Sequence, residues 1–337
     1  MKGRVVIVGG GVAGMQTALS LKALGIESLI LEQSRQLGGK LTGWHLLFPT
    51  FTPAQDVVAP LIRAVRQSGI QTRFGCKVVS VDSRRVILDS GERIDAAAVV
   101  LCSGSTLFNA KIKEEYGYGI YDNVFTSADI EQMMNNGKVA MADGRTPERI
   151  AILHCVGSRD EKVCQRHCSK VCCITAVKQA IELKKLFPDA DVFNFYMDMR
   201  MFGPGYEELY RRAQIEHNIH FVRGRISEAS PLMDSRVQIK AEDTLTGRPL
   251  RMSVDMLVLM VGMRANDDNA FISSSSGAEL AENGFFKPRN SFMDNVLSTK
   301  EGIFLVGTIS SPKTVGQTLN EASAAAIRIA EYLRYGN

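Results

Sequence analysis

The 337-residue sequence predicts an α/β fold with two domains, in which the second domain interrupts the first. Three observations indicate this fold. A β-branched run at residues 4–8 leads through glycines into a helical pattern, a second strand-and-helix unit begins at residue 149, and a further strand and helix follow residue 302. Alternating strands and helices are typical of parallel sheets covered by helices. We expect the C-terminal stretch to complete the first domain.

The first domain begins with a predicted βαβ unit. The strand at 4–8 is followed by a helix at 13–24, which Gly25 ends, and by a strand at 28–31. Apolar residues at helical spacing between two β-branched runs are the basis of this prediction. Further strands of the first domain are expected at residues 70–74, 77–82, 85–88 and 97–101. The stretch 110–136 is interpreted as a connection between the domains.

The second domain begins with a strand at 149–154 and a helix at 171–187, which Pro188 ends. Further strands of the second domain are expected at residues 192–197, 220–223 and 254–261. In the C-terminal part of the first domain we expect a polar loop at the serines 273–276, a strand at 302–306 and an alanine-rich helix at 319–332. The expected domain boundaries are 1–110 and 266–337 for the first domain, 111–148 for the connection and 149–265 for the second domain.

The composition is ordinary for a globular protein, with 45% hydrophobic and 23% charged residues. The net charge of +4 is too small to predict a nucleic-acid partner. No stretch approaches the roughly 18 consecutive apolar residues of a membrane-spanning helix, so no membrane insertion is expected. Since the first strand leaves no room for a signal peptide, we expect a cytoplasmic protein, in which seven cysteines do not form a disulfide framework.

Gly9, Gly11 and Gly14 form a G-x-G-x-x-G motif between the first strand and the first helix. The first glycine permits a tight turn, the second lets the backbone approach a pyrophosphate, and the third lets the helix pack closely on the strand. The N-terminus of the helix offers free N–H groups to phosphates. Glu32, at the end of the second strand, is placed to accept hydrogen bonds from a ribose. The sequence therefore predicts a dinucleotide site.

The continuation from Glu32 to Gly38 and Gly39 resembles the two-dinucleotide-binding-domain flavoproteins, the class of thioredoxin reductase and lipoamide dehydrogenase. Residues 99–104 and 302–307 are similar as well. In that class the N-terminal site holds FAD, so the resemblance implies FAD here. The expected cofactor-binding residues are Gly9, Gly11, Val12, Ala13, Gly14, Glu32, Gln33, Gly38, Gly39, Lys40, Val78, Ser103, Gly104, Gly307, Thr308 and Thr318.

Many members of the class have an aspartate after the late glycine, where this chain has Thr308, whose hydroxyl can still bond a ribityl oxygen. Lys40, Trp44 and His45 follow the glycine pair at 38–39, and a flavin ring often lies against this part of the chain. Surface or core packing is the alternative for each of these three side chains.

Five of the seven cysteines lie between residues 155 and 173, where a pyridine-nucleotide-binding flavoprotein would carry a second glycine-rich turn. Cys155, Cys168, Cys172 and Cys173 form the pattern C-x12-C-x3-C-C, and the last pair begins the second-domain helix. Four thiolates gathered by one loop and one helix start suit a [4Fe-4S] cluster. We expect the helix N-terminus to lower the thiol pKa values. Nearby cations are expected to offset part of the negative charge: Arg159, Lys162, Arg166 and Lys170.

Other interpretations of the cysteines remain open. The adjacent Cys172 and Cys173 are awkward for a structural zinc site, which favours C-x2-4-C pairs. A redox disulfide of the C-x-x-C kind is absent, and a disulfide between adjacent cysteines would be strained. Buried inert cysteines would not crowd in this way. Cys164 could replace one of the four ligands, whereas Cys76 and Cys102 are expected in the core.

The residues around these cysteines closely resemble the A subunit of heterodisulfide reductase. The similarity covers Cys155-Val-Gly-Ser-Arg-Asp, the run 168–173, residues 178–180, the segment 199–210 (MRMFGPGYEELY) and residues 223–225. In that family the four cysteines hold a [4Fe-4S] cluster close to the flavin. The larger methanogen protein carries further cluster motifs that this sequence lacks, so the chain resembles the short A subunits of bacterial sulfur-oxidising complexes.

The resemblance implies an electron-transferring oxidoreductase subunit that exchanges electrons between FAD and the cluster. Expected partners are a second copy of the chain, in a homodimer, and B- and C-type subunits, on which disulfide or sulfane-sulfur chemistry would occur. It also implies that Lys178 lies near flavin N5 and acts catalytically, where its charge would stabilise the reduced flavin. A solvated lysine on a polar helical stripe is the alternative.

Two rival functions are distinguishable in the sequence. A self-sufficient NAD(P)H-dependent flavin disulfide reductase requires a second phosphate loop, which the residues around Cys155 do not provide. A scaffold protein with zinc-binding cysteines and a vestigial nucleotide site is the second rival. Metal and acid-labile sulfide content would separate the zinc scaffold from the electron-transfer protein.

Overall fold

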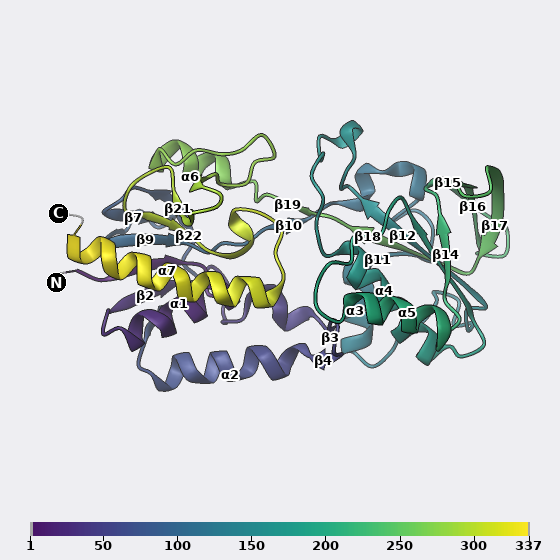
Figure 1. The fold of residues 1–337 in the computed structure, drawn as a ribbon, viewed down its shortest axis with the longest axis horizontal. Coiled ribbons are helices and arrows are strands. Elements are labelled where there is room, and N and C mark those ends of the chain that lie inside the picture. Colours follow the sequence, from purple (N-terminus) through teal and green to yellow (C-terminus); the bar gives the residue numbers. More distant parts are fainter. Residues whose placement is uncertain (1–2, 336–337) are drawn as a thin grey trace. The chain divides into compact units, whose positions relative to one another are not determined.

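The structure is a computed structural model that describes residues 3–335. The chain divides into two compact units. Unit 1 comprises Met1–Thr42, Ala54–Thr106 and Arg264–Asn337, and unit 2 comprises Gly43–Pro53 and Leu107–Met263. In Figure 1 the purple and yellow ribbons belong to unit 1, apart from the purple segment Gly43–Pro53, and the teal ribbons belong to unit 2.

Unit 1 is built on a seven-stranded sheet. In their order across the sheet, its strands are β20 (Pro288–Asn290), β21 (Asp294–Ser298), β22 (Ile303–Leu305), β9 (Ala98–Leu101), β1 (Val5–Val8), β2 (Ser28–Leu31) and β5 (Gln71–Arg73). The five strands from β22 to β5 run parallel. β9 is buried at every position, which is why it reads as a continuous apolar run, as central strands of parallel sheets do.

Two helices of unit 1, α1 (Val12–Ala23) and α7 (Val315–Tyr335), pack against each other, as Figure 1 shows. The other regular elements are α2 (Ala54–Gln67), α6 (Asn269–Ser276), the antiparallel strands β6 (Val78–Val81), β7 (Arg85–Leu88) and β8 (Arg93–Asp95), and the short 3-10 helices η1 (Gly39–Gly43) and η5 (Gly307–Ile309). Small residues on the buried side of α1, such as Ala13, Gly14 and Ala18, allow the helix to pack closely.

Residues 273–276 differ from the prediction of a polar loop, because they form the last turn of α6. Their hydroxyls bond locally to the backbone: Ser273 Oγ donates to Ala278 O, Ser275 Oγ to Ile272 O and Ser276 Oγ to Ser273 O. These bonds let serines, which often favour turns, end a helix. Gly277 stops the helix in the left-handed conformation, with φ 70°.

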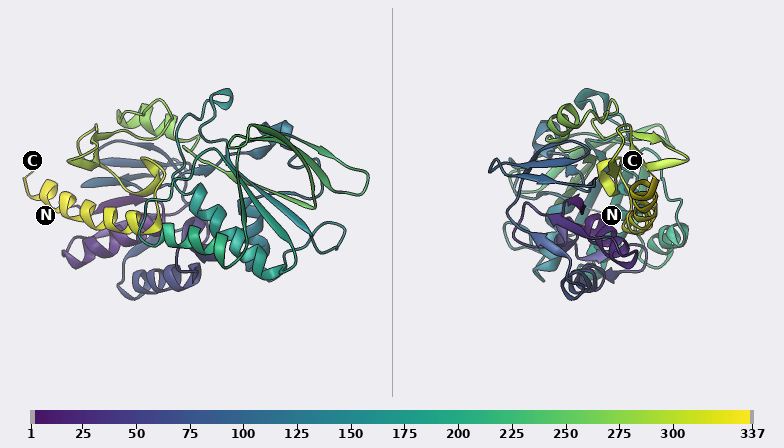
Figure 2. Two further views of the ribbon diagram at one scale, coloured as in Figure 1. Left: turned by 45° about the vertical axis from the view of Figure 1, so that its right-hand side comes forward. Right: turned by 90° about the vertical axis from the view of Figure 1, so that its left-hand side faces the viewer.

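Unit 2 is built on a five-stranded sheet whose strands all run parallel. Their order is β11 (Val124–Thr126), β18 (Met256–Val261), β12 (Arg149–Val156), β13 (Asp191–Tyr196) and β14 (His220–Arg223). The unit also contains α3 (Ser127–Asn135), α4 (Cys172–Leu186), α5 (Tyr206–Ile215), the antiparallel strands β15 (Ile226–Pro231), β16 (Val237–Asp243) and β17 (Arg248–Val254), and the hairpin β3 (Leu46–Leu47) and β4 (Thr52–Pro53). The left view of Figure 2 shows β15 to β17 as long green arrows.

Short elements complete the chain. The 3-10 helices η2 (Ala110–Ile112), η3 (Glu114–Tyr116) and η4 (Glu161–Val163) lie in unit 2, and β10 (Thr106–Leu107) and β19 (Met263–Arg264) lie where the chain passes from one unit to the other. The stretch 111–148, which we predicted as a connection, contains β11 and α3, and both belong to unit 2. Among the helices described, none combines the length and apolarity that crossing a bilayer requires.

The two sheets share one arrangement around their central strands. In unit 1 the chain runs from β1 through a glycine turn at residues 9–11 into α1 and back to β2. In unit 2 it runs from β12 through the loop 157–171 into α4 and back to β13. The carboxyl ends of central parallel strands are where α/β sheets bind ligands. Both predicted sites therefore lie at equivalent positions of the two sheets.

Candidate functional site

The glycine turn of unit 1 has the geometry that its motif predicts. Gly9 has φ 110°, and a Cβ on it would lie 2.6 Å from Cys102 O. A Cβ on Gly14 would lie 2.0 Å from Gly9 O, so only glycine lets α1 begin this close to the turn. Gly11 has open space around it, because only Gly39 Cα, at 3.9 Å, would approach its Cβ. The first turn of α1, with Val12 and Ala13, has no side-chain cap, which leaves its N–H groups for a ligand.

Glu32, at the end of β2, is buried and holds the glycine turn. Its carboxylate accepts hydrogen bonds from Gly10 N at 2.6 Å and from Ser34 N at 2.7 Å. Gln33 follows it and is exposed. Each carboxylate oxygen can accept more than one hydrogen bond, so these contacts leave capacity for a ribose hydroxyl.

The predicted glycine pair at 38–39 lies against the same turn. Gly38 N donates to Gly10 O at 2.9 Å, and Gly38 and Gly11 form an isolated parallel bridge. Gly38 and Gly39 both have positive φ, 114° and 58°, which favours glycine. Lys40 follows and donates from Nζ to Ser105 O, beyond the end of β9.

The late strand brings the remaining predicted residues of unit 1 to the start of α1. A Cβ on Gly307 would lie 3.0 Å from Ala13 Cβ and 3.2 Å from Thr318 Cγ2, and one on Gly104 would lie 3.5 Å from Thr308 Oγ1. These contacts unite the ends of β9 and β22 with the helices α1 and α7.

Two of the predicted cofactor-binding residues, Ser103 and Val78, lie outside the glycine turn. Ser103 is exposed, and its carbonyl oxygen accepts a hydrogen bond from Asn266 at 3.1 Å. Val78 lies in β6 and packs in a hydrophobic cluster with Leu29 and Leu31 of β2. The prediction missed Glu321, whose Oε2 accepts from Gly307 N at 2.7 Å, because a buried glutamate in a helix has no sequence signal of its own.

Unit 2 brings the four predicted cysteines together. Cys155 lies near the end of β12 with a positive φ of 59°, Cys172 and Cys173 begin α4, and Cys168 lies in the loop between them. Cys155, Cys172 and Cys173 are buried and Cys168 is half-buried. Each of the four thiols interacts electrostatically with the other three.

The pKa values of the three buried thiols differ from the prediction. Burial raises the pKa of Cys155 to about 12, and repulsion from Cys173 and Cys168 adds to the shift, while the charge of Arg159 opposes it. Burial also raises the pKa of Cys172 and of Cys173. The prediction that the helix N-terminus lowers these thiol pKa values is wrong, because burial in an apolar core disfavours the thiolate more strongly.

The other cysteines have different surroundings. Cys164 is exposed with φ 56°, Cys76 is half-buried and Cys102 is buried, where burial raises its pKa. Across residues 3–335, no three His, Cys, Asp or Glu side chains are arranged closely enough to hold a single metal ion.

The loop 157–171 is held by hydrogen bonds and by close backbone packing. Ser158 Oγ donates to His167 O at 2.9 Å and accepts from Ser169 N at 3.0 Å, which closes the loop on itself. Gly157 has φ 64°, and a Cβ there would lie 1.9 Å from the Phe108 ring. Arg159 forms two hydrogen bonds with the Asp198 carboxylate, at 2.5 and 3.0 Å. The loop therefore has a defined shape.

A buried ion-pair network, which the sequence did not reveal, fixes the start of this loop. Asp160 accepts from Lys113 at 2.9 Å and from Arg225 at 2.8 Å, and Lys113 also pairs with Glu115 at 2.7 Å. Asp160 and Lys113 are both buried. Asp160 also caps η4 by accepting from Lys162 N. The partners lie far apart in the chain, so no local pattern predicts them.

An Asp160→Asn variant is expected to lower the free energy of unfolding by about 3 kcal/mol, because it leaves Lys113 and Arg225 without their shared carboxylate. Urea denaturation of the two proteins measures the difference. Asp267→Asn is a matched control, since Asp267 pairs with Arg264 at the surface and should contribute only about 0–1 kcal/mol. Equal effects of the two substitutions would show that the Asp160 network is not stabilising.

The pH dependence of this contribution has a definite sign. Burial raises the Asp160 pKa, but the hydrogen bonds and charges of Lys113 and Arg225 outweigh burial, so the pKa lies below its ordinary value. The stabilisation is therefore present above the ordinary carboxyl range and is lost as the pH falls through the lowered pKa. The parent protein should lose more stability than Asp160→Asn on acidification.

Lys178 is not a solvated lysine. Its side chain is 1% exposed, and three oxygen atoms lie within 3.0 Å of Nζ: Leu46 O at 3.0 Å, Glu131 Oε1 at 2.5 Å and Glu182 Oε2 at 3.0 Å. These three oxygens match the three donors of an ammonium group in number. The alternative of a polar, solvated stripe is wrong because the partners come from α3, α4 and the 43–53 segment.

His45 and Gln179 extend the Lys178 network. Glu131 also accepts from His45 N at 2.9 Å and from Gln179 Nε2 at 2.7 Å, and His45 Nδ1 lies 2.9 Å from Glu182 Oε1. His45 is thus a member of a polar network within unit 2. The network joins the short segment 43–53 to α3 and α4.

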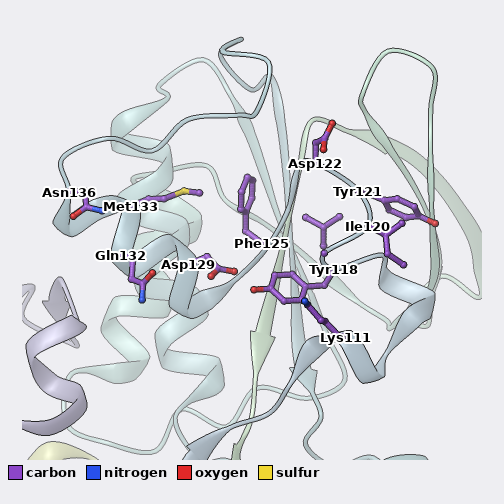
Figure 3. A pocket seen from close by; sticks show the side chains of 12 residues that line it. Lys111, Tyr118, Ile120, Tyr121, Asp122, Phe125, Asp129, Gln132, Met133 and Asn136 are labelled. Atoms are coloured by element: carbon purple, nitrogen blue, oxygen red, sulfur yellow. The ribbon is translucent and has the colours of Figure 1, made fainter. Parts of the chain in front are cut away.

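Unit 2 also has an open pocket of about 570 Å³ near β11, shown in Figure 3. Tyr118 and Asp129 interact there, and burial, followed by the charge of Asp129, raises the pKa of Tyr118. Asp129 is also the capping partner of Thr126 at the start of α3. Asp129, one of the polar residues that line this pocket, thus has a structural role at the start of α3.

Residues 3–157 match the protein family described as "Pyridine nucleotide-disulphide oxidoreductase". Among solved structures, the thioredoxin reductase of Lactococcus lactis is similar over 99% of both chains, with a TM-score of 0.70 and 19% identity. The thioredoxin reductase of T. acidophilum covers 98% of both chains, with a TM-score of 0.68 and 18% identity. The predicted thioredoxin-reductase-like fold of FAD-dependent oxidoreductases is confirmed.

Curated relatives are similar over most of the chain. The iron-sulfur A subunit of the CoB--CoM heterodisulfide reductase of Methanocaldococcus jannaschii is 28% identical over 413 residues, covering 95% of this chain and 63% of that protein. The A subunit of the H(2)/formate:CoB-CoM heterodisulfide,ferredoxin reductase of Methanococcus maripaludis is 37% identical over 244 residues, covering 70% of this chain and 37% of that protein. The chain thus spans less than two thirds of the length of either relative.

Proposed function

From the similarity of this oxidoreductase to A subunits of heterodisulfide reductases along nearly its whole length, we propose that it is their FAD- and cluster-carrying electron-transfer counterpart. Unit 1 would hold FAD, and Cys155, Cys168, Cys172 and Cys173 would hold a [4Fe-4S] cluster. FAD supplies the exchange between two-electron and one-electron chemistry. The proposed domain boundaries are 1–110 and 266–337 for the FAD domain, 111–148 for the connection and 149–265 for the cluster domain.

The cysteine site carries the proposal. Four thiols that interact in every pairing lie at the carboxyl end of β12 and the N-terminus of α4. Unit 1 has its glycine turn at the equivalent position of its sheet, so in unit 2 thiols occupy the place of a phosphate loop. Four cysteines are the ligand set of a [4Fe-4S] cluster. Binding would release the protons that the raised pKa values keep on the buried thiols.

The residues of unit 1 fit a dinucleotide of the FAD kind. The open space at Gly11 and the uncapped first turn of α1 suit a pyrophosphate, whose charge the helix dipole would stabilise. Glu32 would bind the adenosine ribose. Thr308 and Thr318, at the end of β22 and the start of α7, would contact the ribityl chain and the ring. The further contacts proposed are Gln33, Lys40, Val78, Ser103 and Gly104.

Lys178 enters the proposal as a candidate catalytic residue near flavin N5. Its ammonium group already has three oxygen partners, so a flavin contact requires that one of them be exchanged. Within unit 2, Glu131 and Glu182 hold the charge of Lys178 in place. A change of the flavin reduction potential in Lys178 variants would support the role, and an unchanged potential would remove it.

The wider setting of the protein belongs to the same proposal. Both methanogen relatives named above are described as subunits, which supports a place in a complex. We propose a homodimer that works with B- and C-type subunits of a heterodisulfide-reductase-like complex in the cytoplasm. Sulfur oxidation is the proposed process, with the sulfur chemistry on one of those partners.

The experiment that tests the cluster is anaerobic purification followed by iron and acid-labile sulfide analysis. We expect about four iron atoms and about four sulfides per chain, the composition of a [4Fe-4S] cluster, and an EPR signal on reduction. Serine variants of Cys155, Cys168, Cys172 or Cys173 should lose most of the iron. Cys76→Ser is the control that should keep it, and Cys164→Ser tests whether Cys164 replaces a ligand.

Two outcomes would contradict the proposal. Zinc without sulfide would establish the scaffold alternative instead. Rapid bleaching of bound flavin by NADH or NADPH alone would favour the self-sufficient flavin reductase. That second outcome would require a nucleotide site in unit 2, where Cys155 lies near the end of β12 and Gly157 directly follows the strand.

A further inference from the structure

The pocket near β11 lies at one edge of the unit 2 sheet, where β18 is the neighbour of β11. Its lining comes from Lys111, the loop 118–122, β11 and residues of the stretch 129–136, which covers most of α3 and its C-cap, as Figure 3 shows. We call it the edge pocket. Its volume of about 570 Å³ is typical of sites that hold a small organic molecule.

Three aromatic side chains line the edge pocket, and each is anchored on a hydrophobic cluster. Phe125 packs against the cluster that includes Ile130 of α3. Tyr118 and Tyr121 pack against the cluster that includes Ile239 of β16. The aromatic walls of the pocket are therefore held in place by core packing.

The loop that carries the two tyrosines is shaped to hold them. Gly117 has φ 69°, and a Cβ there would lie 2.1 Å from the Tyr121 ring, so this ring packs directly on the backbone. The Tyr118 hydroxyl interacts with the Asp129 carboxylate. That carboxylate also accepts from Thr126 N at 2.8 Å and from Thr126 Oγ1 at 2.7 Å. A ligand therefore meets side chains that are already in position, and little further side-chain entropy is lost on binding.

The charged groups of the edge pocket favour a cation over an anion. Asp122 and Asp129 contribute two carboxylates and Lys111 contributes one ammonium group, which leaves one negative charge in excess. Asp122 is exposed and forms no ion pair among the residues that the structure describes, so its carboxylate is available to a ligand. A phosphate or carboxylate ligand would meet two charges of its own sign.

Two side-chain amides add hydrogen-bond acceptors to the edge pocket. Gln132 lies on α3, and Asn136 is the C-cap four residues further on, so both border the pocket from the same side of the helix. Both are exposed, and neither side-chain amide has a hydrogen-bond partner within residues 3–335. Their oxygen atoms can accept hydrogen bonds from the N–H groups of a protonated amine.

We propose that the edge pocket binds an aliphatic ammonium cation, with its charge between the carboxylates and the aromatic rings. A cation over an aromatic face is attracted by the ring quadrupole, and the attraction is larger where water is excluded. The methylene groups of such a ligand would lie on Phe125 and Met133. Neither FAD nor the cysteine site takes part in this binding, which goes beyond the proposed function.

The test uses the full-length holoprotein and, as the probe, the four-carbon diamine putrescine. Calorimetric titration should show saturable binding with a dissociation constant below about 1 mM. The matched neutral probe is the diol of the same chain length, which should bind at least about tenfold more weakly. Absence of saturation by the diamine up to about 10 mM would overturn the proposal, as would equal binding of the diol.

Three substitutions in the edge pocket should change the affinity with different signs. Phe125→Leu keeps an apolar side chain but removes the ring face, and it should raise the dissociation constant about tenfold. Asp122→Asn should raise it about threefold, whereas Lys111→Gln removes a competing cation and should lower it about threefold. A general loss of structure would weaken binding in every variant, so tighter binding by Lys111→Gln separates the charge effect from damage to the fold.

The controls are matched by residue type within unit 2. Asp189→Asn removes an exposed carboxylate between α4 and β13. Phe221→Leu changes a half-buried ring on β14, at the opposite edge of the same sheet. Neither residue lines the edge pocket, so both variants should keep the dissociation constant within about twofold of the parent value. Equal effects of the control and test substitutions would show that the edge pocket is not the binding site.

The ammonium group can come from a free amine or from a lysine side chain of another protein, and a capped Gly-Lys-Gly peptide distinguishes these sources. Tighter binding of the peptide than of the diamine, with the same dependence on Phe125 and Asp122, identifies a protein side chain as the ligand. Weaker binding of the peptide identifies a free amine. If inorganic phosphate displaces the diamine and depends on Lys111, the pocket takes an anion and the proposal is wrong.

Analysis of FAD, iron and sulfide in each preparation keeps this test separate from that of the proposed function. A protein with full FAD, iron and sulfide that does not bind the diamine loses the cation site and keeps the proposed function. A protein without sulfide that binds the diamine through Phe125 loses the proposed function and keeps the cation site.

Discussion

A Lys178→Met variant is expected to lose about 3–5 kcal/mol of the free energy of unfolding, because it leaves buried carboxylates without their cation. Glu131 is 1% exposed and Glu182 is 6% exposed, so water cannot replace the ammonium group at either of them. The loss should lie at the upper end of this range, since two carboxylates share one lysine. Urea denaturation of the purified variant measures it.

A second variant separates a structural role of Lys178 from a catalytic one. Adding Glu131→Gln to Lys178→Met removes one of the stranded charges and should restore part of the stability. If the lysine is only structural, the stable double variant keeps the flavin reduction potential of the parent protein. If the lysine acts on the flavin, the potential stays changed in the double variant.

The control for Lys178 is Lys77→Met, which breaks an exposed ion pair with Asp268. That pair should contribute about 0–1 kcal/mol, because both partners are solvated and flexible. A Lys178→Met protein as stable as Lys77→Met would contradict the buried network as described.

Gly14→Ala is expected to weaken FAD binding about tenfold to 100-fold. The new Cβ would lie 2.0 Å from Gly9 O and 3.2 Å from Ile7 Cγ2, so α1 must move away from β1 or the glycine turn must change shape. Overpacking of this kind costs about 1–3 kcal/mol, and either movement disturbs the N–H groups that face the pyrophosphate. Titration of FAD into the apoprotein measures the affinity.

Gly43→Ala is a suitable control for Gly14→Ala, because a Cβ on Gly43 meets no atom within 4 Å. Its FAD affinity should equal that of the parent protein. An undiminished affinity in Gly14→Ala would show that the glycine turn does not position the cofactor.

Local patterns predicted those elements whose residues carry their own signal. The β-branched run at Val5–Val8 predicted β1, and the glycines after it predicted the tight turn. The spacing of the cysteines predicted that their thiols lie together. The serines at 273–276 misled the prediction, since their hydroxyls bond to the backbone of the helix that they end. The raised pKa of the Cys172 thiol likewise results from its burial, a tertiary property that the residues at the start of α4 do not show.

The buried polar networks could not be predicted, because their members are distant in the chain. Lys178 pairs with Glu131, 47 residues away, and bonds to the backbone of Leu46, 132 residues away. A lysine on a polar helical stripe has the same local pattern whether the stripe faces water or a second polar surface. Only the tertiary structure distinguishes these two environments.

The division of the chain between the two units has a consequence for biosynthesis. Unit 1 needs β22 and α7, which follow Met263, whereas the residues of unit 2 end at Met263. A ribosome therefore releases all of unit 2 while the unit 1 sheet still lacks β20, β21 and β22. Unit 2 can complete its sheet first, and the early strands β1, β2 and β9 must wait for their last neighbour. Until β22 is made, the edge of β9 that pairs with it stays open, and an unpaired strand edge can pair with another chain.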